Sequence, residues 1–122
     1  MALLPSQLHP GLEDDFYLLD PETACLDRRG CKALSPNGCR LPRASRPLAC
    51  GLFPLVLANG SLYLYAICPA ALHVPLMEWT GLAERACEWL SCLPADDLRR
   101  ISLHISADTL ADRYISMHIR LF

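Results

Sequence analysis

Hydrophobic and polar positions follow a strand-like pattern in the middle of the chain. Residues 48–57 and 61–67 are mainly apolar and include Phe53, Val56, Tyr63, Tyr65 and Ile67, and leucine alternates with tyrosine in the second segment. Between them lies Ala58-Asn59-Gly60, and Asn-Gly is the strongest short signal for a hairpin turn. Pro54 is expected at a sheet edge or a bulge, because it cannot donate to a neighbouring strand. The pattern predicts a β-hairpin with both faces at least partly buried.

The pattern becomes helical from Pro75 to Leu93. Apolar residues recur there at three- and four-residue spacing, with acidic and basic side chains at most other positions. Pro75 suits a first helical turn, and Pro94 is expected to end the helix. A shorter helix is expected over residues 96–101.

The C-terminal residues fit two structures. Every second residue from 115 to 121 is apolar, as in a half-exposed strand, but Leu110, Tyr114, Met117 and Leu121 also have helical spacing. We favour a strand at the end. Such a strand could also pair across a homodimer.

These elements predict a small α+β fold in which the β-hairpin packs on one or two helices beside an irregular cysteine-rich loop. The length of 122 residues favours a single domain, 1–122. Within it, residues 25–69 form the cysteine-cluster segment, and residues 75–122 form the helical part with the C-terminal strand or helix. Hydrophobic residues make up 52% of the chain and charged residues 20%, which excludes global disorder.

Two features bear on location. The stretch from Gly51 to Met77 has no charged residue, but prolines and Asn59-Gly60 break it into pieces shorter than the roughly 20 residues of a spanning helix. No membrane segment is therefore expected. The first ten residues lack the basic and apolar regions of a signal peptide, so we expect a cytoplasmic protein. In that reducing compartment, cysteines serve metal or redox chemistry more often than disulfides.

The charges are arranged in two blocks. Residues 13–27 carry six acids and no base, whereas residues 28–46 carry six of the eleven bases and no acid. The two blocks could simply pair with each other as solvated segments. Alternatively, the basic block serves the cysteines within it, since nearby arginine lowers the pKa of a thiol and offsets thiolate charge. The net charge of −2 creates no overall field that would attract nucleic acid, so a nucleic-acid partner is not expected.

The seven cysteines are the clearest candidate chemistry. Cys31, Cys39, Cys50 and Cys68 follow the spacing Cys-x7-Cys-x10-Cys-x17-Cys, and turn-forming residues stand beside three of them. Glycine lets backbone amides approach and donate to a metal-bound sulfur. Four thiolates would close a tetrahedral zinc site. The spacing is not specific, however, and the same residues could be small buried hydrophobes. Cys87 fits the apolar stripe of the predicted helix, and Cys92 is unassigned.

The strings Gly38-Cys39-Arg40-Leu41-Pro42 and Arg46-Pro47-Leu48-Ala49-Cys50-Gly51-Leu52-Phe53-Pro54, followed by Cys68-Pro69, resemble the YkgJ-type zinc- or iron-chelating cysteine-cluster family. The resemblance covers residues 30–69 and implies metal chelation rather than a reaction. That family usually opens with a Cys-x2-Cys-x3-Cys-Cys knot and has arginine where this chain has Gly51. Only Cys25 stands upstream here, so a single site is expected, with Cys25 as a substitute ligand or a free thiol.

Arg46 is a further candidate, because Pro47 pushes it toward an extended conformation at the entry to a strand holding Cys50. It could donate to a thiolate or to a backbone carbonyl, or it could be an ordinary surface arginine. Of the histidines, His73 is nearest in sequence to Cys68, although a role outside the site is more common for such a residue.

The sequence thus predicts a small metal-binding protein with a mainly structural four-cysteine site. Zinc is the first choice of metal, and iron, mononuclear or as a Fe–S cluster, is the alternative. A second hypothesis is an adaptor that binds an acidic protein or RNA through the basic loops, and a third is a thiol-redox or metal-dependent enzyme. No catalytic residue is predicted, because the sequence has no phosphate-binding glycine loop and no hydrolase or zinc-protease motif.

Overall fold

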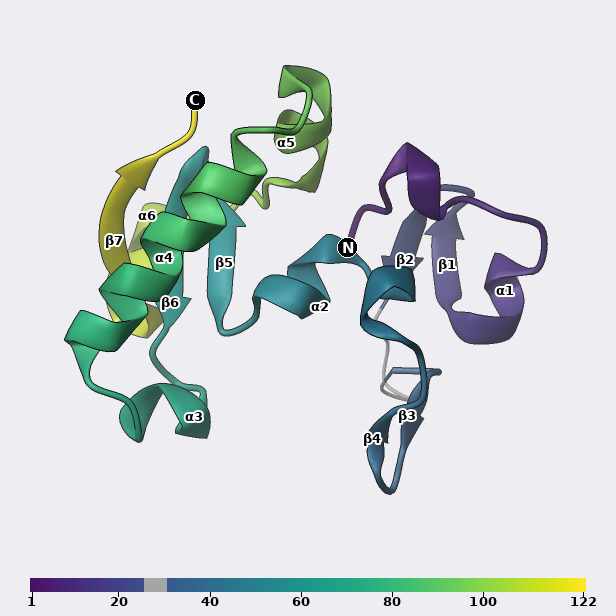
Figure 1. Cartoon of the computed structure of the whole chain (residues 1–122), viewed down its shortest axis with the longest axis horizontal. Coiled ribbons are helices and arrows are strands. Elements are labelled where there is room, and N and C mark those ends of the chain that lie inside the picture. The colour runs from purple at the N-terminus through teal and green to yellow at the C-terminus, as the bar shows by residue number, and fades with distance from the viewer. Residues whose placement is uncertain (26–30) are drawn as a thin grey trace. The chain divides into compact units, whose positions relative to one another are not determined.

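A computed structural model describes residues 1–25 and 31–122 (Figure 1). The fold is α+β, as the sequence predicts, with short helices and small antiparallel sheets. Contacts within the chain divide it into two compact units, Met1–Gly51 and Leu52–Phe122, which we call unit 1 and unit 2.

The first half of unit 1 is built around a two-stranded sheet. Its elements are the 3₁₀ helix η1 (Pro5–Gln7), the helix α1 (Leu12–Asp15) and the strands β1 (Tyr17–Asp20) and β2 (Thr23–Cys25). Strands β1 and β2 are antiparallel. The first residues extend this pairing, because Met1 and Ala24 exchange two backbone hydrogen bonds of 2.8 Å each.

The second half of unit 1 carries most of the basic block. It consists of β3 (Leu34–Ser35), β4 (Gly38–Cys39), the 3₁₀ helix η2 (Arg43–Ser45) and α2 (Leu48–Leu52). The predicted start of the first strand is wrong here, because residues 48–52 are helical and Cys50 lies on a helix. The carbonyl of Pro47 accepts from the amide of Cys50 at 2.9 Å. None of these five residues is β-branched, and a proline suits the start of a helix.

The core of unit 1 is small. It contains six buried side chains, two of which are alanines: Leu3, Leu12, Phe16, Ala24, Ala33 and Leu41. Cys31 and Cys39 are partly buried against this core. A unit of this size with so few large apolar side chains is at the lower limit of what hydrophobic burial can stabilise.

Unit 2 contains the predicted hairpin. Strands β5 (Leu55–Ala58) and β6 (Ser61–Tyr65) are antiparallel, and β7 (Tyr114–Arg120) pairs with β6 to give the order β5-β6-β7. The turn residues Asn59 and Gly60 have φ angles of 50° and 81°. Positive φ at both positions is the reason that Asn-Gly is favoured in such a turn.

Other segments of unit 2 hold this turn in place. The Asn59 side chain donates to the carbonyl of Ile105 at 2.7 Å and accepts from its amide at 3.1 Å. A Cβ at Gly60 would lie 2.5 Å from the carbonyl oxygen of Phe122, so the chain end can approach only a glycine there. The turn therefore connects the sheet to the segment that contains Ile105 and to the C-terminal residues.

The helices of unit 2 are α3 (Pro69–Leu72), α4 (Leu76–Leu90), α5 (Ala95–Ile101) and α6 (Ala107–Arg113). Helix α4 lies across the sheet and contacts β6 and β7 (Figure 1). Its buried residues Trp79, Ala83 and Leu90 lie on one side, whereas Trp89, which the pattern assigns to packing, is 50% exposed. The prediction of a hairpin packed on a helix is confirmed. Among residues 1–25 and 31–122, none of the helices has the length and apolar character needed to cross a bilayer.

The predicted C-terminal strand is confirmed as β7, and its partner within the chain is β6. The competing helical spacing also has a structural counterpart, because α6 ends at Arg113, directly before the strand. Ser106 caps α6, since its side chain accepts a hydrogen bond from the amide of Thr109. Pairing of this strand across a homodimer stays a prediction.

Candidate metal centre

Two predicted ligands flank the β3–β4 hairpin of unit 1. Cys39 in β4 pairs with Leu34, and the carbonyl of Cys31 accepts from the amide of Leu34 at 3.1 Å. Gly38 precedes Cys39 with a φ of 100°, a conformation that favours glycine. Both cysteines are free thiols, partly buried against the core. Two thiols that are eight positions apart in sequence thus pack against the same core.

Cys50 approaches the same region from α2. Its Sγ lies 3.3 Å from Sδ of Met1. Partial burial of the thiol raises the pKa of Cys50, and the nearby Cys31 and Cys39 raise it further, because neighbouring thiolates repel one another. The N-terminal ammonium and Arg46 act in the opposite direction. Cys31 and Cys39 are therefore close enough to Cys50 to affect its ionisation.

The raised pKa of Cys50 predicts how the metal-free protein responds to pH. In the unfolded chain this thiol ionises first, so the folded state holds its proton longer as the pH rises. Folding stability therefore falls as the pH increases from the ordinary thiol pKa to the raised one. We expect alkylation of Cys50 to reach half its maximal rate at a higher pH than alkylation of free cysteine, measured by mass spectrometry.

A double variant provides the control for this prediction. Because Cys31 and Cys39 both raise the pKa of Cys50, replacing both by serine is expected to move the alkylation midpoint down. A wild-type midpoint at or below that of free cysteine would contradict the arrangement of the three thiols.

The three thiols do not form a ready-made coordination sphere. Within residues 1–25 and 31–122, no three histidine, cysteine, aspartate or glutamate side chains are grouped so that they could hold a metal ion. The donor chemistry suits zinc or iron, but binding would require the thiols to move closer together. Such movement is typical of small metal-binding units, in which the ion completes the fold.

The remaining cysteines lie elsewhere or outside the described part. The backbone of Cys25 ends β2, directly after Ala24, but its side chain lies outside the described residues. Cys68 belongs to unit 2, where its carbonyl accepts from the amide of Ala71 at 3.0 Å, so its role as fourth ligand stays a prediction. Cys87 is half-buried and Cys92 exposed near the C-terminal end of α4. His73 is exposed in unit 2.

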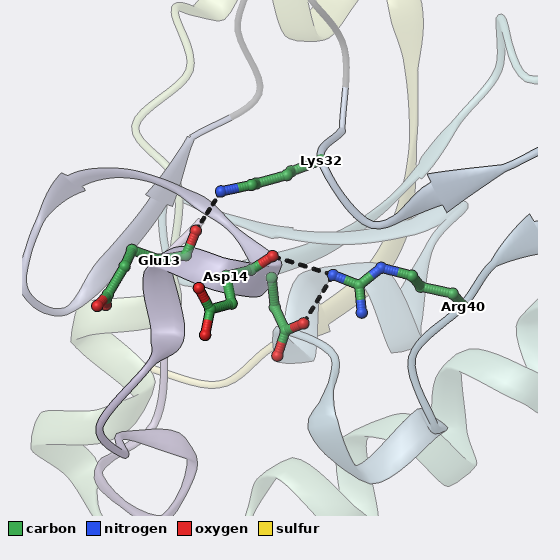
Figure 2. Close-up of polar contacts among 5 residues, drawn as sticks. Glu13, Asp14, Lys32 and Arg40 are labelled. Atoms are coloured by element: carbon green, nitrogen blue, oxygen red, sulfur yellow. Dashed lines mark hydrogen bonds and ion pairs between the residues drawn. The ribbon is translucent and has the colours of Figure 1, made fainter.

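The basic block is engaged within unit 1. Arg46, the predicted auxiliary residue, donates from Nε to the carbonyl of Leu41 at 3.0 Å, which is one of the roles expected for it. Lys32 and Arg40 contact the acidic helix α1 (Figure 2). The acidic and basic blocks therefore pair in part, as one of the two interpretations of the sequence expects. Three of the six bases thus have contacts in unit 1, and the adaptor hypothesis stays a prediction.

Comparison with known proteins adds no relative: no family model matches this chain, and no curated protein or solved structure does so either. The resemblance to the YkgJ-type family stays a prediction.

Sequence reasoning left one part of this region open and missed another. Pairing of the two charge blocks is one of two interpretations of the sequence, but the pattern does not show that residues 13–15 contact the bases beside Cys31 and Cys39. The contact between Cys50 and Met1 joins residues 49 positions apart, and no local pattern indicates it.

Proposed function

We propose that unit 1 binds one metal ion, preferably zinc, through the thiolates of Cys31, Cys39 and Cys50 together with a fourth cysteine. The role of the ion is mainly structural. It holds the β3–β4 hairpin and α2 to the rest of the unit, and no catalytic step is assigned to it. The reducing cytoplasm is the location that suits such a site, because the thiols must stay reduced.

The observation that carries this proposal is the nearness of three thiols in unit 1. Cys31 and Cys39 pack against the core of this unit, and Cys50 is near enough for both to affect its ionisation. The unit spans 51 residues and buries few large side chains. Units of this size commonly depend on a disulfide or a structural metal, because their cores supply too little free energy alone. A metal site would supply the free energy of folding that this small core lacks.

Two cysteines compete for the fourth position. Cys68 completes the spacing pattern, whereas Cys25 belongs to unit 1 and follows Ala24, the backbone partner of Met1. Met1 in turn contacts the thiol of Cys50. Separate replacement of Cys25 and Cys68 by serine distinguishes them, because only loss of the true ligand should weaken metal binding.

Metal analysis of the freshly purified protein, combined with a visible spectrum, tests the proposal. Zinc gives about one equivalent per chain and no visible absorption, since its d shell is full. Iron gives the coloured spectrum of a thiolate-bound iron or a Fe–S cluster. Absence of bound metal, together with unchanged folding in the presence of a chelator, would overturn the proposal.

A further inference from the structure

We propose that Lys32 and Arg40 are positioning residues of the cysteine cluster, which fix Cys31 and Cys39 by attaching the neighbouring residue of each to α1. Lys32 directly follows Cys31, and Arg40 directly follows Cys39. The inference rests on the proposed metal site and names the part of the chain that prepares it. We call the contacts of these two bases with α1 the α1 tether.

Arg40 makes two of the contacts in the α1 tether. Its Nη2 donates to Oδ1 of Asp15 at 2.7 Å and to the carbonyl oxygen of Asp14 at 3.1 Å. The side chains of Arg40 and Asp15 are 47% and 24% exposed, so the ion pair is partly screened by solvent. One guanidinium nitrogen thus joins a carboxylate and a backbone carbonyl at the end of the same helix.

Lys32 makes the other contacts. Its Nζ donates to the carbonyl oxygen of Glu13 (Figure 2). The same Nζ lies 5.6 Å from the centre of the Tyr17 ring, within the range of a cation–π interaction. Both bases therefore reach the C-terminal carbonyls of α1.

Those carbonyls are a suitable anchor for two cations. The last carbonyls of a helix have no amide partner within it, so they can accept hydrogen bonds from a cation. The acidic side chains of Glu13, Asp14 and Asp15 add negative charge there. The end of α1 is thus complementary to the bases that follow the cysteines.

The hairpin that follows Cys31 and carries Cys39 is short, although Ala33, Leu41 and both cysteines pack against the core. Strands β3 and β4 pair at only two positions, Leu34 with Cys39 and Ser35 with Gly38, and Leu34 is 66% exposed. The α1 tether limits movement of the hairpin, because the attached residues adjoin the two cysteines in sequence.

Zinc affinity at low salt, measured by competition with a chromophoric chelator, tests the α1 tether. Arg40→Ala is expected to weaken zinc binding by about three- to fivefold, the range of an exposed ion pair with a good geometry. Arg40→Lys should restore part of the loss, and 0.5 M salt should reduce the difference from wild type. Arg43→Ala is the matched control, because it removes one exposed charge of the same segment without touching α1.

A double-variant cycle separates positioning from charge alone. Asp15→Asn should weaken zinc binding like Arg40→Ala, and the two changes together should cost little more than one of them. If Arg40→Ala and Arg43→Ala have equal effects, or if the Arg40 and Asp15 changes are additive, the tether does not position the thiols.

A readout without metal keeps this inference separate from the proposed function. In the metal-free protein, Arg40→Ala should increase the alkylation rate of Cys39 at fixed pH, whereas Arg43→Ala should not. If the wild-type protein binds no zinc but the alkylation result holds, the metal site is refuted and the tether stands. If zinc binds and neither affinity nor alkylation distinguishes Arg40→Ala from Arg43→Ala, the tether is refuted.

Discussion

Leu3→Ala is expected to lower the free energy of unfolding of metal-free unit 1 by about 2–5 kcal/mol, the usual cost of truncating a buried leucine. Leu3 is 1% exposed and belongs to the core against which Cys31 and Cys39 pack. The core of so small a unit supplies only about 3–5 kcal/mol in total, so the metal-free variant should lose most of its ordered structure. Zinc should restore the ordered structure, because an ion present at 1,000 times its Kd adds about 4 kcal/mol to the free energy of unfolding.

Amide hydrogen exchange measured on peptides from each unit provides the test. Peptides of unit 1 should exchange faster in the variant without zinc, and peptides of unit 2 serve as an internal reference. Leu19→Ala is the matched control, because Leu19 also belongs to unit 1 but is 71% exposed. Equal exchange in the two variants would show that Leu3 does not belong to the stabilising core of unit 1.

Cys39→Ser is expected to weaken zinc binding by more than about 100-fold, since loss of an outer partner alone costs 10- to 100-fold and a serine hydroxyl is a poor replacement for a thiolate. The change removes one sulfur atom from β4 and keeps the size of the side chain. The hairpin should survive, because its backbone pairing with Leu34 does not involve the thiol. Chelator competition measures the affinity, and the circular dichroism spectrum verifies the fold.

Cys92→Ser is the matched control for Cys39→Ser. Cys92 is an exposed free thiol in unit 2, after the end of α4. Its replacement changes the number of cysteines by one in the same way, but it should leave zinc affinity within twofold. A loss of affinity of the same size in both variants would show that zinc binds thiols without selection.

The elements of unit 2 could be predicted from the sequence because their signals are local. Asn59-Gly60 requires positive φ at both turn positions, and leucine alternation in β6 places Leu62 and Leu64 on the buried face. Helix α4 has the expected spacing but ends at Leu90, and Pro94 precedes α5 instead of closing α4. Local periodicity thus identified the elements better than their boundaries.

Unit 1 was harder to predict, because its structure depends on contacts between distant residues. Residues 48–52 are apolar without a clear period, so the run could not distinguish a short helix from a strand. The N-terminal residues pair with β2 more than twenty positions away. Residue types identified the candidate ligands, but which thiols lie near one another depends on this long-range pairing. Spacing alone could not assign Cys50 to the neighbourhood of Met1, Cys31 and Cys39.

The most direct test of the metal site counts protected thiols. The reduced, metal-free protein is titrated with zinc, and each cysteine is then alkylated and quantified by mass spectrometry. One equivalent of zinc should protect Cys31, Cys39 and Cys50 and one further cysteine, while Cys92 stays as reactive as before. Zinc that leaves the alkylation of Cys31, Cys39 and Cys50 unchanged would contradict the central claim.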